Sequence, residues 1–263
     1  MAFLRVPGAE LYYEVTGDGV PIILVHGLAL DARMWDAQVP ALSKIATIIR
    51  YDARGFGRSP RQGNEVIYTH GDDLWMLANH LGIDSAVLVG LSMGGRIVLE
   101  AAVTAPERVT ALVLLDAVVD GVPWDPESER GMQSISSELG SGGLAAAKEA
   151  WLHHGFFTPA QRQPSVADQL AQMVADYSGV HWTEPDPHGP HPDIAALLPT
   201  LQTPTTIVVG ELDVPCFVAM ADAMADAIPG ARKVVVPDAG HMVNMEAPAM
   251  INALLRDVVL SLG

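Results

Sequence analysis

Short runs of apolar, often β-branched residues recur along the chain, and each ends abruptly at a glycine or at polar residues. Runs of this length without polar alternation are typical of strands that are buried on both faces of a parallel sheet. The pattern predicts strands at residues 21–25, 46–51, 85–89, 110–115, 205–209 and 232–236. The run at 11–16 predicts an antiparallel strand at the start of the sheet.

Segments of helical length lie between these runs, at residues 33–44, 65–81, 93–104, 217–227 and 247–260, and their apolar residues follow amphipathic spacing. A regular alternation of strand and helix is the pattern of a doubly wound sheet. We therefore predict an α/β fold with a mostly parallel central sheet.

The alternation stops between residues 118 and 196, where glycine, proline and histidine interrupt helical pieces at 144–153 and 166–177. The segment HWTEPDPHGPHPD, at 181–193, is predicted to be a loop because its prolines remove backbone donors and restrict the backbone. We read residues 118–196 as an inserted helical cap. Residues 1–117 and 197–263 then form the core.

Composition narrows the classes of partner. Hydrophobic residues make up 49% of the 263 residues and charged residues 17%, which suits one large buried core. The formal net charge of -16 would repel phosphate backbones and anionic lipid surfaces, so we expect neither nucleic acid nor a membrane as partner.

The single cysteine, Cys216, excludes an intramolecular disulfide and is predicted to be a packed, inert thiol. The first residues have no signal-peptide pattern, and no apolar run is long enough to span a bilayer. We expect a soluble cytoplasmic protein.

The sequence VLVGLSMGG, at 87–95, places Ser92 directly after a predicted strand and before a predicted helix. A serine on such a sharp turn needs small residues two positions to either side, because Cβ atoms there would clash. Gly90 and Gly94 meet this need. The context predicts that Ser92 is a catalytic nucleophile.

A serine hydroxyl becomes a good nucleophile when an imidazole removes its proton. His241, in VVVPDAGHMVNMEAP after the last predicted strand, is the histidine placed to do so. Asp213, in TTIVVGELDVP, follows the preceding strand and is predicted to orient the imidazole. Asp116, at the end of ALVLLDA, stays open as an alternative acid.

The loop in ILVHGLALDARMW follows the first parallel strand, where an enzyme with such a serine nucleophile would place oxyanion donors. We predict that the backbone N–H groups of Leu28 and Met93 hold the oxyanion. His26 is expected to brace this loop through hydrogen bonds. In the neighbouring loop, RYDARGFGRS, we expect Arg54 to pair with Asp52.

Aromatic residues of the cap predict an apolar pocket for a small to medium acyl or lactone group. Those assigned to substrate binding are Trp124, Trp151, Phe156 and Trp182. The later histidines show no regular ligand spacing and no evident carboxylate partner, so no metal site is predicted among them. They are His153, His154, His181, His188 and His191.

Together the segments HGL, YDARGFGRS, GLSMGG, GELD and AGHMVNMEAP resemble the α/β-hydrolase superfamily over essentially the whole chain outside the cap. LDARMWDAQVPALSK and GLSMGGRIVLEAAVTAPERV are similar to 3-oxoadipate enol-lactonases and related small carboxylesterases. The resemblance implies a Ser-His-Asp triad that hydrolyses a small-molecule ester or lactone through an acyl-enzyme without a cofactor.

Other branches of the superfamily remain as alternatives. Haloalkane dehalogenases and epoxide hydrolases carry aspartate at the nucleophile position, so Ser92 argues against both. A carbon–carbon bond hydrolase and a cofactor-free haloperoxidase or perhydrolase stay open, as does a non-catalytic ligand-binding protein on the same fold. Assembly as a homodimer also stays open.

Overall fold

The computed structural model describes residues 2–262 and contains an eight-stranded sheet with the order β1-β2-β4-β3-β5-β6-β7-β8. The antiparallel pairs are β1 with β2 and β2 with β4, and the remaining neighbours are parallel. The mostly parallel sheet is therefore confirmed. Its strands are β1 (Ala2–Val6), β2 (Ala9–Thr16), β3 (Val20–Val25), β4 (Ala46–Tyr51), β5 (Ala86–Leu91), β6 (Val109–Leu115), β7 (Thr205–Gly210) and β8 (Arg232–Val236).

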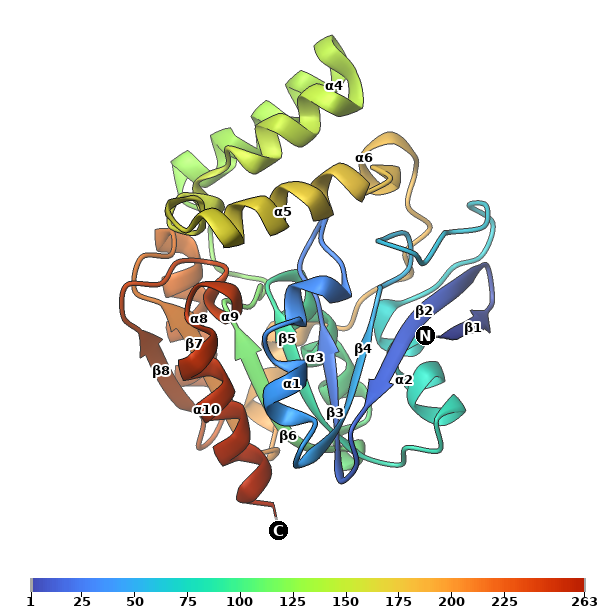
Figure 1. Cartoon of the computed structure of the whole chain (residues 1–263), viewed down its shortest axis with the longest axis vertical. Helices are drawn as coiled ribbons and strands as arrows, with labels where there is room; N and C mark the ends of the chain where they lie inside the picture. Colours follow the sequence, from blue (N-terminus) through green and yellow to red (C-terminus); the bar gives the residue numbers. More distant parts are fainter. Residues whose placement is uncertain (1, 263) are drawn as a thin grey trace.

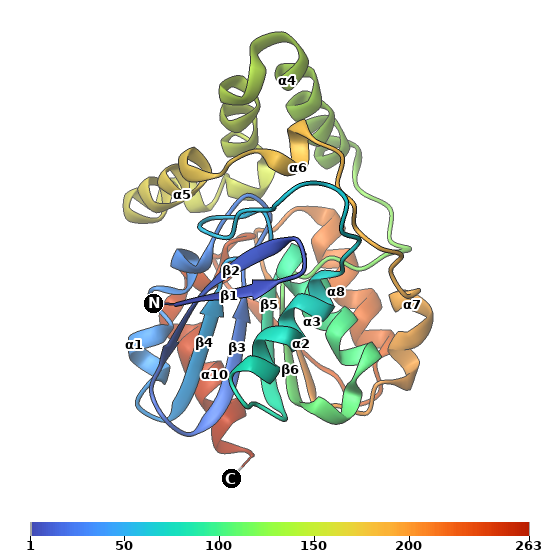
Figure 2. The same cartoon turned by 90° about the vertical axis from the view of Figure 1, so that its right-hand side faces the viewer.

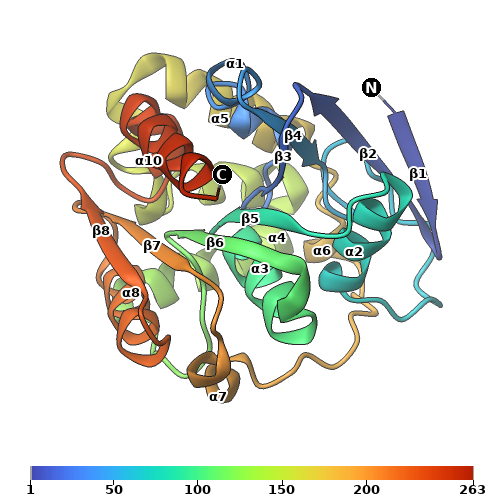
Figure 3. The ribbon, with the colours of Figure 1, turned by 90° about the horizontal axis from the view of Figure 1, so that it is seen from below.

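Helices cover both faces of the sheet: α1 and α10 lie on one face, and α2, α3 and α8 on the other (Figure 3). Every residue of β5 and β7 is buried, because parallel strands between two helical layers have no solvent-facing side. Within residues 2–262, no helix combines the length and apolar character needed to cross a bilayer. The helices that cover the two faces of the sheet are α1 (Val39–Leu42), α2 (His70–His80), α3 (Met93–Thr104), α8 (Pro215–Ala227) and α10 (Pro248–Leu260).

Three further helices, α4 (Pro126–Leu152), α5 (Pro164–Asp176) and α6 (Val180–Thr183), lie over one end of the sheet (Figures 1 and 2). Helix α4 bends at Gly143, whose φ of 75° is not helical. Only its second part was predicted, because the first part is rich in serine, glycine and glutamate and carries few apolar residues. The short helices α7 (Ile194–Leu197) and α9 (Val243–Glu246) complete the helical elements.

Several predicted boundaries are wrong for local reasons. The segment 33–44 is a 3-10 turn (Ala32–Trp35) followed by α1, because Pro40 favours the first turn of a new helix. Helix α2 begins at His70, where the Thr69 side chain accepts a hydrogen bond from the Asp72 amide at 3.0 Å. Residues 180–183, at the start of the predicted loop, form α6. Strand β1 was not predicted.

Cys216 is buried near the start of α8, with its sulfur 3.8 Å from Ser128 Oγ. Burial raises the pKa of the thiol to about 11, so the reactive thiolate is scarce at neutral pH. The prediction of a packed, unreactive cysteine agrees with both observations.

Candidate active site

Ser92 occupies a strained turn between β5 and α3. Its backbone has φ 56° and ψ -115°, which non-glycine residues seldom adopt. The turn is held by the neighbouring strand, because the Ser92 amide donates to the Leu115 carbonyl at 3.0 Å. This is the sharp strand-to-helix geometry that presents a serine hydroxyl at the edge of a sheet.

The glycines around Ser92 are required by close backbone contacts. A Cβ at Gly90 would lie 2.1 Å from the carbonyl oxygen of Gly94. A Cβ at Gly94 would lie 2.2 Å from the carbonyl oxygen of Val25 at the end of β3. The predicted steric reason for this motif therefore holds, and Gly94 also brings α3 against the loop that follows β3.

The His241 ring is fixed by Asp213. Its Nδ1 lies 2.9 Å from Asp213 Oδ2, and both side chains are almost fully buried. Because a carboxylate accepts, Nδ1 carries the proton and Nε2 keeps its lone pair. Within residues 2–262, no hydrogen bond joins Ser92 Oγ to this ring; such contacts often tighten only when substrate binds.

Asp116, the alternative acid, lies beside this pair without replacing Asp213. One oxygen of each carboxyl group and a ring nitrogen of His241 all lie within 4.8 Å of one another. Asp116 Oδ1 accepts from the Gly210 amide at 2.8 Å. Burial, reinforced by the nearby charge of Asp213, raises the pKa of Asp116 well above its usual range. Because burial disfavours the charged form of Asp116, and because Asp213 already accepts from His241 Nδ1, Asp213 is the better partner for the imidazole.

Glu246 also holds His241 in place, which the sequence analysis missed. Its Oε2 accepts from the Gly240 amide at 2.8 Å and its Oε1 accepts from the Met242 amide at 2.9 Å. These amides flank His241 on both sides, so the carboxylate clamps the loop that carries His241. Burial raises the pKa of Glu246. The sequence feature that could have pointed to Glu246 is its position in the AGHMVNMEAP segment, close to His241.

The two predicted oxyanion donors lie beside Ser92. Leu28 and Met93 line the same cavity as Ser92. Among the described residues neither amide donates to another protein group, and Met93 opens α3, where backbone N–H groups have no intrahelical acceptor. Both amides are thus available to a developing negative charge.

The loop after β3 is braced by His26, as expected. Its Nδ1 donates to the Gly27 carbonyl at 2.8 Å, and its Nε2 accepts from the Ala53 amide at 2.9 Å. The predicted pairing of Arg54 with Asp52 is wrong. Arg54 binds Asp73 through two hydrogen bonds of 2.7 and 2.8 Å.

Asp52 instead accepts from the Ala32 and Arg58 amides at 2.8 Å each. The carboxylate thereby joins the loop after β4 to the turn that follows the oxyanion loop. Closeness in sequence favoured a pairing of Arg54 with Asp52. The actual partner of Arg54 is Asp73, which lies on α2 and is further away in sequence.

A cavity of about 160 Å³ opens at Ser92. Trp124, Trp151 and Phe156 line it as predicted, whereas Trp182 is outside its wall and packs edge-on against Trp151 at 6.2 Å. The remaining wall is also apolar; it consists of Leu28, Met93, Val118, Met132 and Phe217.

Two of the wall residues also contact His241. The rings of Phe156 and Phe217 lie 4.9 and 4.2 Å from the His241 ring. Phe217, which the sequence analysis did not assign to the pocket, therefore joins the apolar wall to the imidazole. Ser92 thus lines the cavity, and the His241–Asp213 pair contacts the cavity wall through these two rings.

Comparisons with known proteins identify the fold family. The sequence profile of the family described as alpha/beta hydrolase fold matches residues 20–248. The chain is similar to a thermophilic esterase from Thermogutta terrifontis, with 32% identity and a TM-score of 0.80 over 99% of this chain and 97% of that one. It is also similar to the enol-lactonase from Burkholderia xenovorans, with 26% identity and a TM-score of 0.80 over 98% and 100%.

A putative carbamate hydrolase of a Caulobacter species is 30% identical over 92% of this chain and 93% of its own length. These relatives span nearly the whole chain. The expected superfamily is confirmed. The chain belongs to the α/β-hydrolase fold family and is a hydrolase of that fold.

Proposed function

We propose that this hydrolase cleaves carboxylic esters or lactones with short, uncharged acyl groups through an acyl-enzyme on Ser92. The observation that carries the proposal is the buried Asp213–His241 hydrogen bond beside an apolar cavity that opens at Ser92. The similarity to an esterase and an enol-lactonase supports the same class of reaction.

In this mechanism Ser92 Oγ attacks the carbonyl carbon while its proton passes to His241 Nε2. The amides of Leu28 and Met93 stabilise the oxyanion. Collapse of the tetrahedral intermediate breaks the bond to the alcohol, which takes the proton from His241. Water then attacks the acyl-enzyme by the same route, and Asp213 stabilises the imidazolium in both halves.

The cavity supports a short acyl group. Its volume of about 160 Å³ lies below the roughly 300–1,000 Å³ typical of pockets that enclose drug-sized ligands. None of its lining residues is charged. An acyl group with a carboxylate would be buried there without a partner, at a cost of several kcal/mol. Acetyl to butyryl esters fit both properties.

Steady-state hydrolysis of p-nitrophenyl acetate, butyrate and octanoate tests this proposal. We expect turnover of the first two esters, at least about tenfold lower kcat/KM for octanoate, and loss of activity in Ser92→Ala. Ser261→Ala, at an exposed serine remote in sequence from the site, is the matched control and should keep full activity. Unchanged activity in Ser92→Ala, or a wild-type protein inactive on every ester, would refute the proposal.

A further inference from the structure

A second cavity, of about 210 Å³, shares Leu28 and Met93 with the cavity at Ser92. Its wall is unusually rich in groups that bind cations, and the proposed ester hydrolysis uses none of them. These are His70, His181, His188, His191, Glu100 and Asp186. Arg96 also lines this cavity but is ion-paired with Asp120, which offsets its positive charge.

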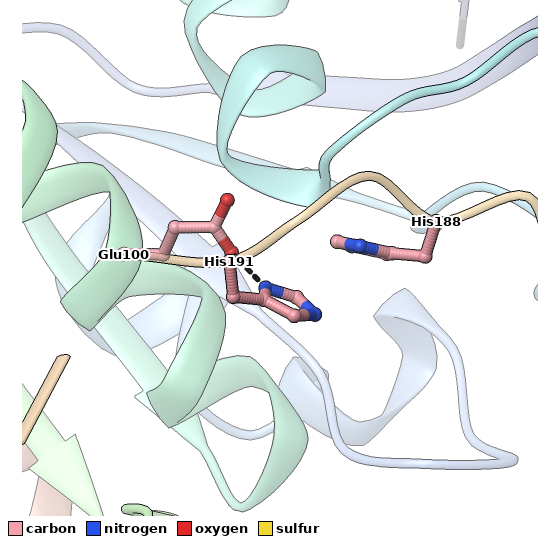
Figure 4. A group of neighbouring side chains, drawn as sticks. All are labelled: Glu100, His188 and His191. Carbon is pink, nitrogen blue, oxygen red and sulfur yellow. Dashed lines mark hydrogen bonds and ion pairs between the residues drawn. The ribbon is translucent and has the colours of Figure 1, made fainter. Parts of the chain in front are cut away.

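Three of these side chains converge. Glu100 lies on α3 with its side chain 4% exposed, and His188 and His191 lie on the segment between α6 and α7. One carboxylate oxygen and one ring nitrogen from each histidine all lie within 4.8 Å of one another. Figure 4 shows the hydrogen bond between Glu100 Oε2 and His191 Nδ1, at 3.1 Å, and the His188 ring directed toward this pair.

His188 offers a lone pair that no protein group uses. Its Nδ1 lies 2.9 Å from the Gly189 carbonyl, which can only accept, so Nδ1 carries the proton. Its Nε2 is buried and has no hydrogen-bond partner among residues 2–262. A backbone carbonyl that orients the protonated nitrogen, leaving the other nitrogen free, is the usual support for a metal-binding histidine.

We propose that Glu100, His188 and His191 bind a divalent transition-metal cation of the zinc class. Two imidazoles and a carboxylate are a ligand set that zinc takes, with a fourth position left for water. The two nitrogens favour zinc over magnesium or calcium, which prefer oxygen ligands.

Binding requires one of the two imidazole rings to reorient. Ligand atoms about 2.0–2.2 Å from a tetrahedral ion are roughly 3.4 Å apart. The rings of His188 and His191 stack with centroids 4.0 Å apart, so one must turn for both nitrogens to face the ion. His191 can turn because its side chain is 34% exposed. The bound ion would tie the segment between α6 and α7 to α3, the helix that begins directly after Ser92.

Titration of the chelator-treated, full-length protein with Co²⁺ tests the site, because cobalt replaces zinc and its visible absorption reports the coordination geometry of the bound ion. We expect one cobalt per chain, displacement by Zn²⁺, and a higher Tm with zinc. His188→Gln and His191→Gln should each weaken binding at least about tenfold. A third variant, Glu100→Gln, changes a buried carboxylate and could fail to fold. His191→Gln then still tests the site, because the His191 side chain is partly exposed.

Two control variants complete the design. His153→Gln removes an exposed histidine that lies near Glu149, and it should bind cobalt as the wild type does. His241→Ala disrupts the other group that could hold a cation, formed with Asp116 and Asp213, and the cobalt spectrum should persist. Three results would overturn the proposal. They are absence of cobalt binding to the wild type, wild-type affinity for cobalt in both His188→Gln and His191→Gln, and loss of the cobalt spectrum only in His241→Ala. None of these readouts depends on ester hydrolysis.

Discussion

Replacing Asp213 with asparagine should reverse the tautomer of His241. Asp213 Oδ1 accepts from the Val214 amide at 2.7 Å, and Oδ2 accepts from His241 Nδ1 at 2.9 Å. An asparagine that keeps its carbonyl on the Val214 amide turns its NH₂ group toward Nδ1. That nitrogen must then accept, which moves the ring proton to Nε2 and removes the lone pair that would deprotonate Ser92. The flipped amide is no better, since its NH₂ would face the Val214 N–H.

The expected loss is large. In serine proteases with the same arrangement, this substitution lowers kcat by about 10⁴ while leaving the geometry intact. That factor corresponds to about 5 kcal/mol of transition-state stabilisation. We expect a loss of ~10³–10⁴ in kcat for p-nitrophenyl acetate at neutral pH, with the Tm little changed.

Asp116→Asn is the matched comparison, because it changes the neighbouring carboxyl group to the same amide. It should keep kcat within about threefold of the wild type, since asparagine mimics a neutral carboxyl and tolerates the φ of 42° at this position. The reasoning is refuted if Asp213→Asn loses less than tenfold, or if Asp116→Asn loses activity while Asp213→Asn keeps it.

Three other predictions concern stability. Glu246→Gln loses one charge-assisted hydrogen bond to the amides beside His241. It should therefore lower the free energy of unfolding by about 1.5–3 kcal/mol and also lower kcat/KM, and an unchanged urea midpoint would contradict this. Because the pKa of Asp116 is raised in the fold, its contribution to stability is complete below the unfolded pKa of about 3.9 and is lost as pH rises through the folded value. The free energy of unfolding of Asp116→Asn should therefore increase relative to that of the wild type as pH rises, by at most about 1.4 kcal/mol per pH unit. A difference between the two in urea unfolding that does not change with pH would refute this. Gly94→Ala places a Cβ 2.2 Å from the Val25 carbonyl oxygen, so it should destabilise by about 1–3 kcal/mol or more, and a Tm equal to that of the wild type would contradict the contact.

The fold was predictable where local sequence alone determines the element. The strands at 46–51 and 232–236 and the helix at 93–104 match their predicted bounds, because their apolar runs end at clear polar or turn residues. The first part of α4 was missed, since its composition has little helical amphipathicity and tertiary packing determines its structure.

The candidate site divides in the same way. Ser92, Asp213 and His241 were named from motif and chain order, and the structure brings the last two into contact. Glu246 and Phe217 act on His241 through contacts that no spacing rule encodes. The convergence of a carboxylate from α3 with two histidines from the segment between α6 and α7 likewise appears only after folding.

Reaction with a fluorophosphonate followed by peptide mass mapping tests the central claim most directly, because the reagent phosphonylates a serine that a neighbouring base activates. The account predicts one adduct per chain, on the peptide that contains Ser92, absent in Ser92→Ala and formed much more slowly in His241→Ala. No adduct on the wild type would indicate a ligand-binding protein. An adduct on another residue would contradict the assignment of Ser92 as the nucleophile.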